Sequence, residues 1–224
     1  MVYRGPYNRR SRRSRYRRRR RFRRYASPTY AQIGSKVFRD VQRLKNLINV
    51  EFKSHLHQTN TSPSTSGHVS YVTNVDKGDS ISQRDGDQIR LKSIETRGMY
   101  TLNPSATSTT VRLMWVLVKN VNGATPAIGD IIETLGSSDV SSLRNLEYRR
   151  NVVILKDMVM VLNSDTPKRY VKYYRKMDAK LLYNGSATDV TAAESNSVFL
   201  VQISDEATNT PTVELNTRVR FIDN

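Results

Sequence analysis

Arginine side chains fill the segment between positions 9 and 24, and no acidic residue balances their charge. The first 24 residues contain thirteen arginines, no lysine, no aspartate and no glutamate. Such a segment repels itself and has too little apolar surface to offset the entropy lost on ordering, so we expect residues 1–26 to form a disordered arm. Guanidinium groups pair with phosphates, and the rings of Tyr16 and Phe22 can stack on unpaired bases. The arm therefore predicts binding to a single-stranded nucleic acid.

The same arm has the composition of a nuclear localisation signal, which a host importin recognises through basic clusters. The two roles are compatible, because one arm can act in import and later bind a genome. The arm residues assigned to nucleic-acid binding are Arg9, Arg10, Arg12, Arg13, Arg15, Tyr16, Arg17, Arg18, Arg19, Arg20, Arg21, Phe22, Arg23 and Arg24.

Catalytic or metal chemistry has little support in the sequence. His55 and His57 would point the same way on a strand, but no third ligand is evident, so we interpret them as exposed histidines. Four aspartates in residues 76–87 do not match a calcium-binding loop and suit turns better. There is no glycine-rich phosphate loop and no nucleophile elbow, and cysteine is absent. We expect a protein that is not an enzyme and assign no metal or cofactor.

The charge is unevenly distributed along the chain. The 224 residues carry a formal net charge of +17 from 37 basic and 20 acidic residues. Removing the thirteen arginines of the arm leaves 24 basic residues against the same 20 acidic ones, so the body carries only about +4. A nearly neutral body with a cationic arm favours nucleic acid as the partner. No apolar run is long enough for a membrane span or a signal peptide, so we expect neither a membrane partner nor secretion.

Residues 27–52 are predicted to form an amphipathic basic helix. Ser27 is a plausible N-cap, and Pro28 suits the first helical position. Apolar residues then recur at steps of three and four, which is one stripe of a helix that needs a partner surface. This stripe consists of Ile33, Val37, Val41, Leu44 and Ile48. The basic residues elsewhere on the helix, assigned to nucleic-acid binding, are Lys36, Arg39, Arg43 and Lys45.

After a linker at residues 53–67, the pattern changes to strands separated by turns. About eight strands, with no alternation of strands and helices, predict an all-β fold: a single eight-stranded jelly-roll β-sandwich over residues 68–224. Trp115, Leu113 and Leu117 are assigned to its core. Residues 128–135 could form a short helix or a strand. The expected strands are 68–76, 87–101, 111–121, 151–163, 170–183, 197–204 and 212–222.

A second group of basic residues surrounds three tyrosines at positions 168–176. On a strand, Lys172 and Lys176 would share a face with Tyr170 and Tyr174, while Arg175 would lie opposite with Tyr173. Either this face extends the nucleic-acid surface or it is simply a solvated strand face; both interpretations stay open.

Several stretches resemble coat proteins of the satellite tobacco necrosis virus type. The stretch GDSISQRDGDQIRLKSIETRG at 78–98 resembles the entry to their second long strand. The stretch VRLMWVLVKNVNGATPAIGDIIET at 111–134 resembles the strand that follows. Further matches are RRNVVILKDMVMVLN at 149–163, LLYNGSAT at 181–188 and VFLVQISD at 198–205. Their fixed order makes the resemblance more specific than any one motif.

The resemblance implies a viral capsid protein, found in the virion, whose jelly roll assembles as about sixty copies into a T=1 shell. It also implies a helix that points inward and helps to bind the genome. The arginine- and tyrosine-dense arm is closer to that of circoviruses and other Rep-encoding circular single-stranded DNA viruses, which favours DNA over RNA and a stage in the host nucleus. Some family members hold divalent cations at subunit contacts, but no ligand can be matched here. The alternative is a cellular nucleic-acid-binding protein, ribosomal or chromatin-associated, with a basic tail.

Overall fold

The computed structural model describes residues 30–47, 52–133 and 139–223. The chain divides into two units, residues 1–50 and 51–224, which are described separately. In the first unit the described element is helix α2 (Tyr30–Leu47). The expected arm at residues 1–26 lies outside the described residues. None of the described helices is long and apolar enough to cross a membrane.

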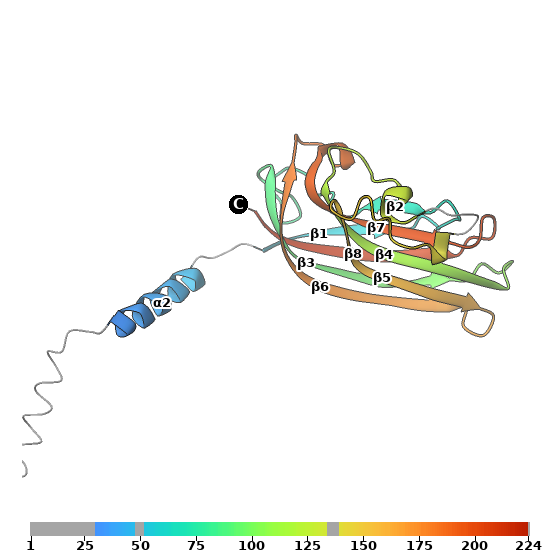
Figure 1. Cartoon of the computed structure of the whole chain (residues 1–224), viewed down its shortest axis with the longest axis horizontal. Helices are drawn as coiled ribbons and strands as arrows, with labels where there is room; N and C mark the ends of the chain where they lie inside the picture. Colours follow the sequence, from blue (N-terminus) through green and yellow to red (C-terminus); the bar gives the residue numbers. More distant parts are fainter. Residues whose placement is uncertain (1–29, 48–51, 134–138, 224) are drawn as a thin grey trace, which may run out of the picture. The chain divides into compact units, whose positions relative to one another are not determined.

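The second unit is built from eight strands, with short helical turns between some of them (Figure 1). Six of the seven strands expected from the sequence lie within four residues of their predicted ends; the strand expected at 68–76 is shorter and ends at Tyr71. Residues 128–135, for which the sequence allows a helix or a strand, begin with the short helix α3 (Ile128–Ile131). The strands are β1 (Phe52–Thr59), β2 (His68–Tyr71), β3 (Gln88–Thr101), β4 (Ser108–Asn120), β5 (Val152–Asn163), β6 (Lys168–Tyr183), β7 (Ala193–Ser204) and β8 (Thr212–Asp223).

The strands pair antiparallel in the order β1-β8-β3-β6-β7-β4-β5, and β2 also pairs with β7. Strands β6 and β7 are joined only through Leu182 with Ser195 and Tyr183 with Ala193. The path therefore separates into two groups of four, β1-β8-β3-β6 and β2-β7-β4-β5, linked at one corner. This is the strand order of a jelly roll, and the all-β jelly-roll prediction is confirmed.

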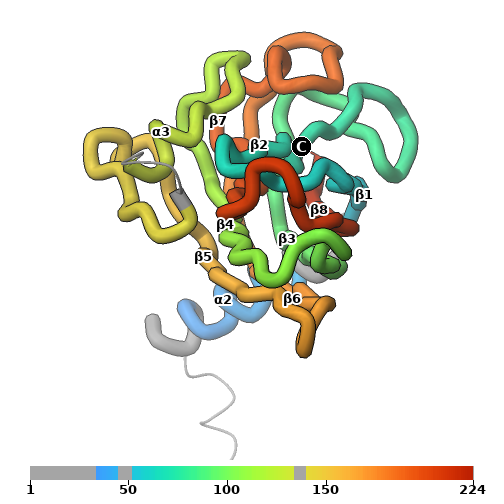
Figure 2. The backbone as a smooth tube through the Cα atoms, turned by 90° about the vertical axis from the view of Figure 1, so that its right-hand side faces the viewer, coloured from blue at the N-terminus to red at the C-terminus, as the bar shows by residue number. Residues whose placement is uncertain are grey.

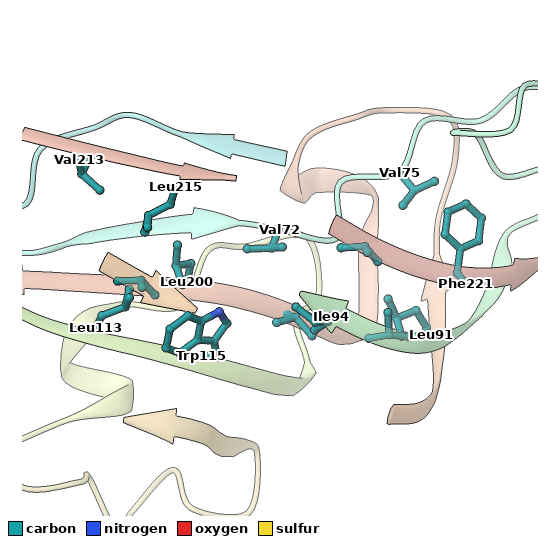
Figure 3. Packing of buried hydrophobic residues seen from close by; sticks show 14 of the residues in the cluster. Val72, Val75, Leu91, Ile94, Leu113, Trp115, Leu200, Val213, Leu215 and Phe221 are labelled. Carbon is teal, nitrogen blue, oxygen red and sulfur yellow. The ribbon is translucent and has the colours of Figure 1, made fainter. Parts of the chain in front are cut away.

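The main hydrophobic core lies between these two groups of strands (Figure 3). Leu91 and Ile94 of β3 and Phe221 of β8 belong to the same buried cluster as residues of β4 and β7. Trp115 of β4 is fully buried, and its Nε1 donates a hydrogen bond to Oγ1 of Thr96 at 2.9 Å. Leu113 is also fully buried, and Leu117 packs against the cluster, so all three predicted core residues are confirmed.

A second hydrophobic cluster covers the opposite face of β4 and β7. Met114 and Phe199 point to this side, where Ile131 and Val140 pack against them from α3 and from the short turn η1 (Asp139–Ser141). Figure 2 shows α3 beside β7 and β4, away from β1 and β8. Both faces of β4 are therefore buried, which explains its nearly continuous apolar sequence.

Two predicted boundaries differ from the structure. The linker expected at 53–67 is wrong over its first part, because residues 52–59 form β1 and pair with β8 from Phe52–Ile222 to Thr59–Leu215. This edge strand carries few apolar residues, and Phe52 and Leu56 are exposed, so no hydrophobic alternation marks it. The helix expected at 27–52 is described from Tyr30 to Leu47.

Candidate nucleic-acid interface

Helix α2 separates basic from apolar side chains. Lys36, Arg39 and Arg43 follow one another at steps of three and four, so they share one side of the helix, and all three are exposed. Val37, Val41 and Leu44 of the predicted stripe are exposed within this unit as well, at 42–60%. The helix thus offers three cations on one side and an uncovered apolar stripe on another.

For the other predicted nucleic-acid-binding residues, Lys45 and the arm residues, the structure describes no side chain. Lys45 lies in α2, but its side chain is not among those described. The fourteen arm residues from Arg9 to Arg24 lie outside the described part of the chain, so their assignment stays a prediction.

Strand β6 carries the second basic group, and the predicted face is exposed, although Arg169 and Arg175 at the alternate positions are exposed as well. Tyr170, Lys172, Tyr174 and Lys176 are all exposed. Tyr173 turns inward instead, and its ring centroid lies 4.4 Å from that of Trp115.

The structure adds cations that the sequence interpretation missed. In the register of the sheet, Arg218 of β8 lies opposite Glu95 of β3, and Glu95 lies opposite Tyr174 of β6. In the next row along the strands, Arg97 of β3 lies opposite Lys172 of β6. The polar positions of β8 alternate with its buried ones, and this alternation is the sequence signal that Arg218 and Arg220 share an exposed face. The two rows join cations from three strands on one exposed face.

Other charged side chains hold the body together. Arg84 is fully buried and donates to the carbonyl oxygen of Val75 at 3.1 Å and to Oδ1 of Asp87 at 3.0 Å. Lys77 also donates to Asp87, and these two bases hold the pKa of that carboxyl below its usual value. Asp87, one of the four aspartates in residues 76–87, thus stabilises this loop by accepting hydrogen bonds from Lys77 and Arg84.

Lys53 is likewise buried, although it lies on an edge strand. Its Nζ donates to Asp85 at 2.8 Å and to Asp223 at 3.3 Å. The hydrogen bond to Asp85 raises the pKa of Lys53, although burial opposes the shift. These two hydrogen bonds of Lys53 join β1 to β8 and to the loop before β3.

The two histidines of β1 are half-buried, not exposed as the sequence suggested. Nε2 of His55 and Nδ1 of His57 both donate to Oδ1 of Asn74, each at 3.1 Å. Burial lowers the pKa of His57, although the hydrogen bond to Asn74 opposes this. In the described part of the chain, no group of three or more histidine or acidic side chains could hold a metal ion.

An eight-stranded jelly roll preceded by a basic helix and an arginine-rich segment is the architecture of a small-virus coat protein. The sequence pattern of the family described as "Satellite tobacco necrosis virus coat protein" matches residues 25–224. The chain belongs to this family.

Three similar proteins accompany the family match. The chain is 29% identical to the coat protein of Maize white line mosaic satellite virus over 164 residues, covering 71% of this chain and 74% of that protein. It is 27% identical to the capsid protein of Satellite tobacco necrosis virus 1 over 176 residues, covering 76% and 86%. Among solved structures, Desmodium yellow mottle tymovirus overlays with a TM-score of 0.37 at 11% identity, covering 77% and 87%.

Family membership decides between the two functions expected from the sequence. The chain is a viral coat protein and not an enzyme, and it forms a homo-oligomeric shell around a nucleic-acid genome. The alternative of a ribosomal or chromatin-associated protein is wrong.

Proposed function

We propose that this coat protein assembles as about sixty copies into a T=1 icosahedral shell and packages a single-stranded genome through its N-terminal arm. The supporting observation is the charge asymmetry: thirteen arginines lie in the first 24 residues, ahead of a body with only about +4. In this proposal the shell domain extends from β1 to the end of β8. The exposed cations Lys36, Arg39 and Arg43 of α2, together with Lys45, extend the arm's binding surface.

Electrostatics explains why such an arm binds whatever base sequence is present. Sixty arms would bring roughly 800 positive charges into one shell, against one negative charge per nucleotide. Arginines that neutralise phosphates release the counterions condensed on the polymer, so binding depends strongly on salt and little on sequence. An arm without fixed structure can follow many genome paths.

Deleting residues 1–24 tests this proposal. We expect the truncated protein to form shells about 20 nm across, since the jelly roll does not need the arm, but to contain far less nucleic acid. Electron microscopy gives the diameter, and the ratio of absorbance at 260 and 280 nm gives the content. If truncated and full-length shells hold equal amounts, the arm is not the packaging element.

We favour DNA over RNA as the genome, because the arm combines dense arginine with tyrosine as the circovirus-like arms do. Nucleic acid extracted from virions should resist ribonuclease and be degraded by a nuclease specific for single-stranded DNA. The opposite sensitivity would establish an RNA genome and leave the packaging proposal intact.

The arm also has the basic clusters that an importin binds, so we propose a nuclear stage in the host. A fluorescent fusion of the full chain should accumulate in nuclei, and the fusion lacking residues 1–24 should not. Equal distribution of the two fusions would remove this role from the arm.

A further inference from the structure

The outer face of β1-β8-β3-β6 is hollowed along the strands. Three hollows, of about 700, 450 and 350 Å³, lie on it. The first and second share Arg220 in their walls, and the second and third share Arg97 and Asn216. They adjoin one another and form one groove, which we call the sheet groove.

The sheet groove has an excess of positive charge. Two acidic side chains line it, Glu95 and Glu214, and Glu95 is already paired with Arg97 at 2.6 Å. Leaving aside the buried Lys53, its basic side chains are Lys92, Arg97, Lys172, Lys176, Arg218 and Arg220. Lys92 is already paired with Asp178 at 2.7 Å. The other five basic side chains and the two acidic ones give the groove a net charge of +3.

Four of these basic side chains are available to an external anion. Among the described residues, no acidic side chain forms an ion pair with Lys172, Lys176, Arg218 or Arg220. All four are exposed. The hydrogen bond from Arg97 lowers the pKa of Glu95, and the nearby charges of Arg218 and Arg220 add to this shift.

Two tyrosines stand beside these cations. Tyr170 is 79% exposed and Tyr174 is 52% exposed. Both line the groove on the same side of β6 as Lys172, and they lie roughly 13 Å apart at the usual rise of a strand. A strand face that only meets solvent does not need exposed aromatic rings, whereas unpaired bases stack on them.

The position of the groove in the fold gives a second line of argument. The outer face of β2-β7-β4-β5 is covered by the second hydrophobic cluster, so the groove lies on the sheet face that stays open. Strand β1 is the edge strand of the same sheet, and it follows the helix and arm directly in the chain. The arm is therefore tethered to the sheet that carries the groove.

We propose that the sheet groove is a second genome-binding surface that faces the interior of the shell. It holds a single-stranded segment, with phosphates on Lys172, Lys176, Arg218 and Arg220 and unpaired bases on Tyr170 and Tyr174. This inference rests on the proposed function, because its ligand is the packaged genome. A sulfated polysaccharide would use the cations from outside the shell but would leave the tyrosine rings without a role.

Photocrosslinking in full-length virions tests the contact itself. Ultraviolet irradiation followed by nuclease and protease digestion should yield peptides from residues 168–183 that carry a nucleotide on Tyr170 or Tyr174. Crosslinks confined to the arm would overturn the inference and leave the proposed function standing. Purified shells that contain no nucleic acid would instead contradict the proposed function.

A charge variant with a matched control tests the contribution to packaging. The full chain with Lys172→Ala, Lys176→Ala, Arg218→Ala and Arg220→Ala loses four of the twenty-one cations that the arm (thirteen), helix α2 (four) and the groove (four) offer together. It should package about a fifth fewer nucleotides per shell. The control carries Lys119→Ala, Arg149→Ala, Arg150→Ala and Lys156→Ala, which remove four exposed cations outside the groove. Equal packaging by the two variants would overturn the inference.

A tyrosine variant, compared with the charge variant, separates genome binding from polysaccharide binding. Tyr170→Leu with Tyr174→Leu keeps every cation, and it should abolish the crosslinks in residues 168–183 without changing retention of intact virions on a heparin column. If the charge variant loses heparin retention while its packaged nucleic acid matches that of the control, the groove faces outward and the inference fails.

Discussion

At the scale of single residues, buried charges in the body fix loops through several hydrogen bonds each. Arg84 is the clearest case: it is fully buried, and its guanidinium lies 4.3 Å from the centroid of the Tyr183 ring. It donates to carbonyl oxygens of Val75 and Gly86 in its own loop and of Gly185 in the loop after β6. A sequence alone places arginine on the surface, because buried arginine is rare unless it is paired. Here the pairing is with Asp87 and with backbone oxygens.

Replacing Arg84 by methionine should therefore destabilise the body strongly. The carbonyl oxygens of Val75 and Gly86 would lose their donor, and Asp87 would lose a partner, at a cost of about 3 kcal/mol or more. Urea-induced unfolding of the full-length protein measures this. The control is Arg90→Met, since Arg90 is half-exposed and, within the described part of the chain, forms an ion pair only with Asp178, so its loss should cost less than about 1 kcal/mol. Equal losses would show that Arg84 does not hold these loops.

The burial of His57 predicts that the free energy of unfolding depends on pH near neutrality. Burial lowers its pKa below 6.5, so the unfolded chain binds a proton more readily than the folded one. Stability should then fall as the pH drops through about 6.5 toward 5. His57→Gln should flatten this part of the curve of melting temperature against pH. Because burial also lowers the pKa of His68, the double variant with His68→Gln should flatten it further. An unchanged slope in both variants would contradict the linkage.

At the scale of elements, long strands pack closely enough that one position tolerates no side chain. Gly98 of β3 lies opposite Leu215 of β8, and a Cβ atom there would meet the carbonyl oxygen of Glu214 at 1.9 Å and Cα of Leu215 at 2.8 Å. Both atoms belong to the backbone, so neither can move aside without shifting the strand.

Gly98→Ala should therefore destabilise the sheet by roughly 2 kcal/mol, because β8 must move away from β3. Gly129→Ala in α3 is the matched control, since a Cβ there meets nothing within 4 Å. Thermal unfolding of the two full-length variants compares them. A neutral Gly98→Ala would mean that β3 and β8 separate easily.

At the scale of the whole molecule, the charge of the arm rather than its sequence should set how much genome a shell holds. Replacing Arg17, Arg18, Arg19, Arg20 and Arg21 by glutamine removes five of the arm's thirteen charges, out of twenty-one cations when helix α2 and the groove are included, and should lower the packaged nucleotides by roughly a quarter. Replacing the same five by lysine keeps the charge and should restore most of the content. Nucleotides per shell, from absorbance and mass, separate the two. If the lysine variant packages no more than the glutamine variant, charge is not the controlling quantity.

The sequence by itself determined the features that depend on neighbouring residues. Helical periodicity from Val37 to Leu44 predicted α2, and strict alternation from Val213 to Phe221 predicted β8, because each side chain's direction follows from local backbone geometry. The charge asymmetry is a property of composition and needed no fold. The ordered motifs at 78–205 then indicated the coat-protein family, which the family match confirms.

Only the tertiary structure decided what depends on pairing between distant segments. Strand β1 carries no apolar alternation, and it is a strand because β8 pairs with it, more than 150 residues later in the sequence. The register of β8, β3 and β6 brings Arg218, Glu95 and Tyr174 into one row, although each lies far from the others in the sequence. Such contacts arise from long-range packing, which no local pattern encodes. The groove therefore follows from the register of the paired strands and not from the sequence alone.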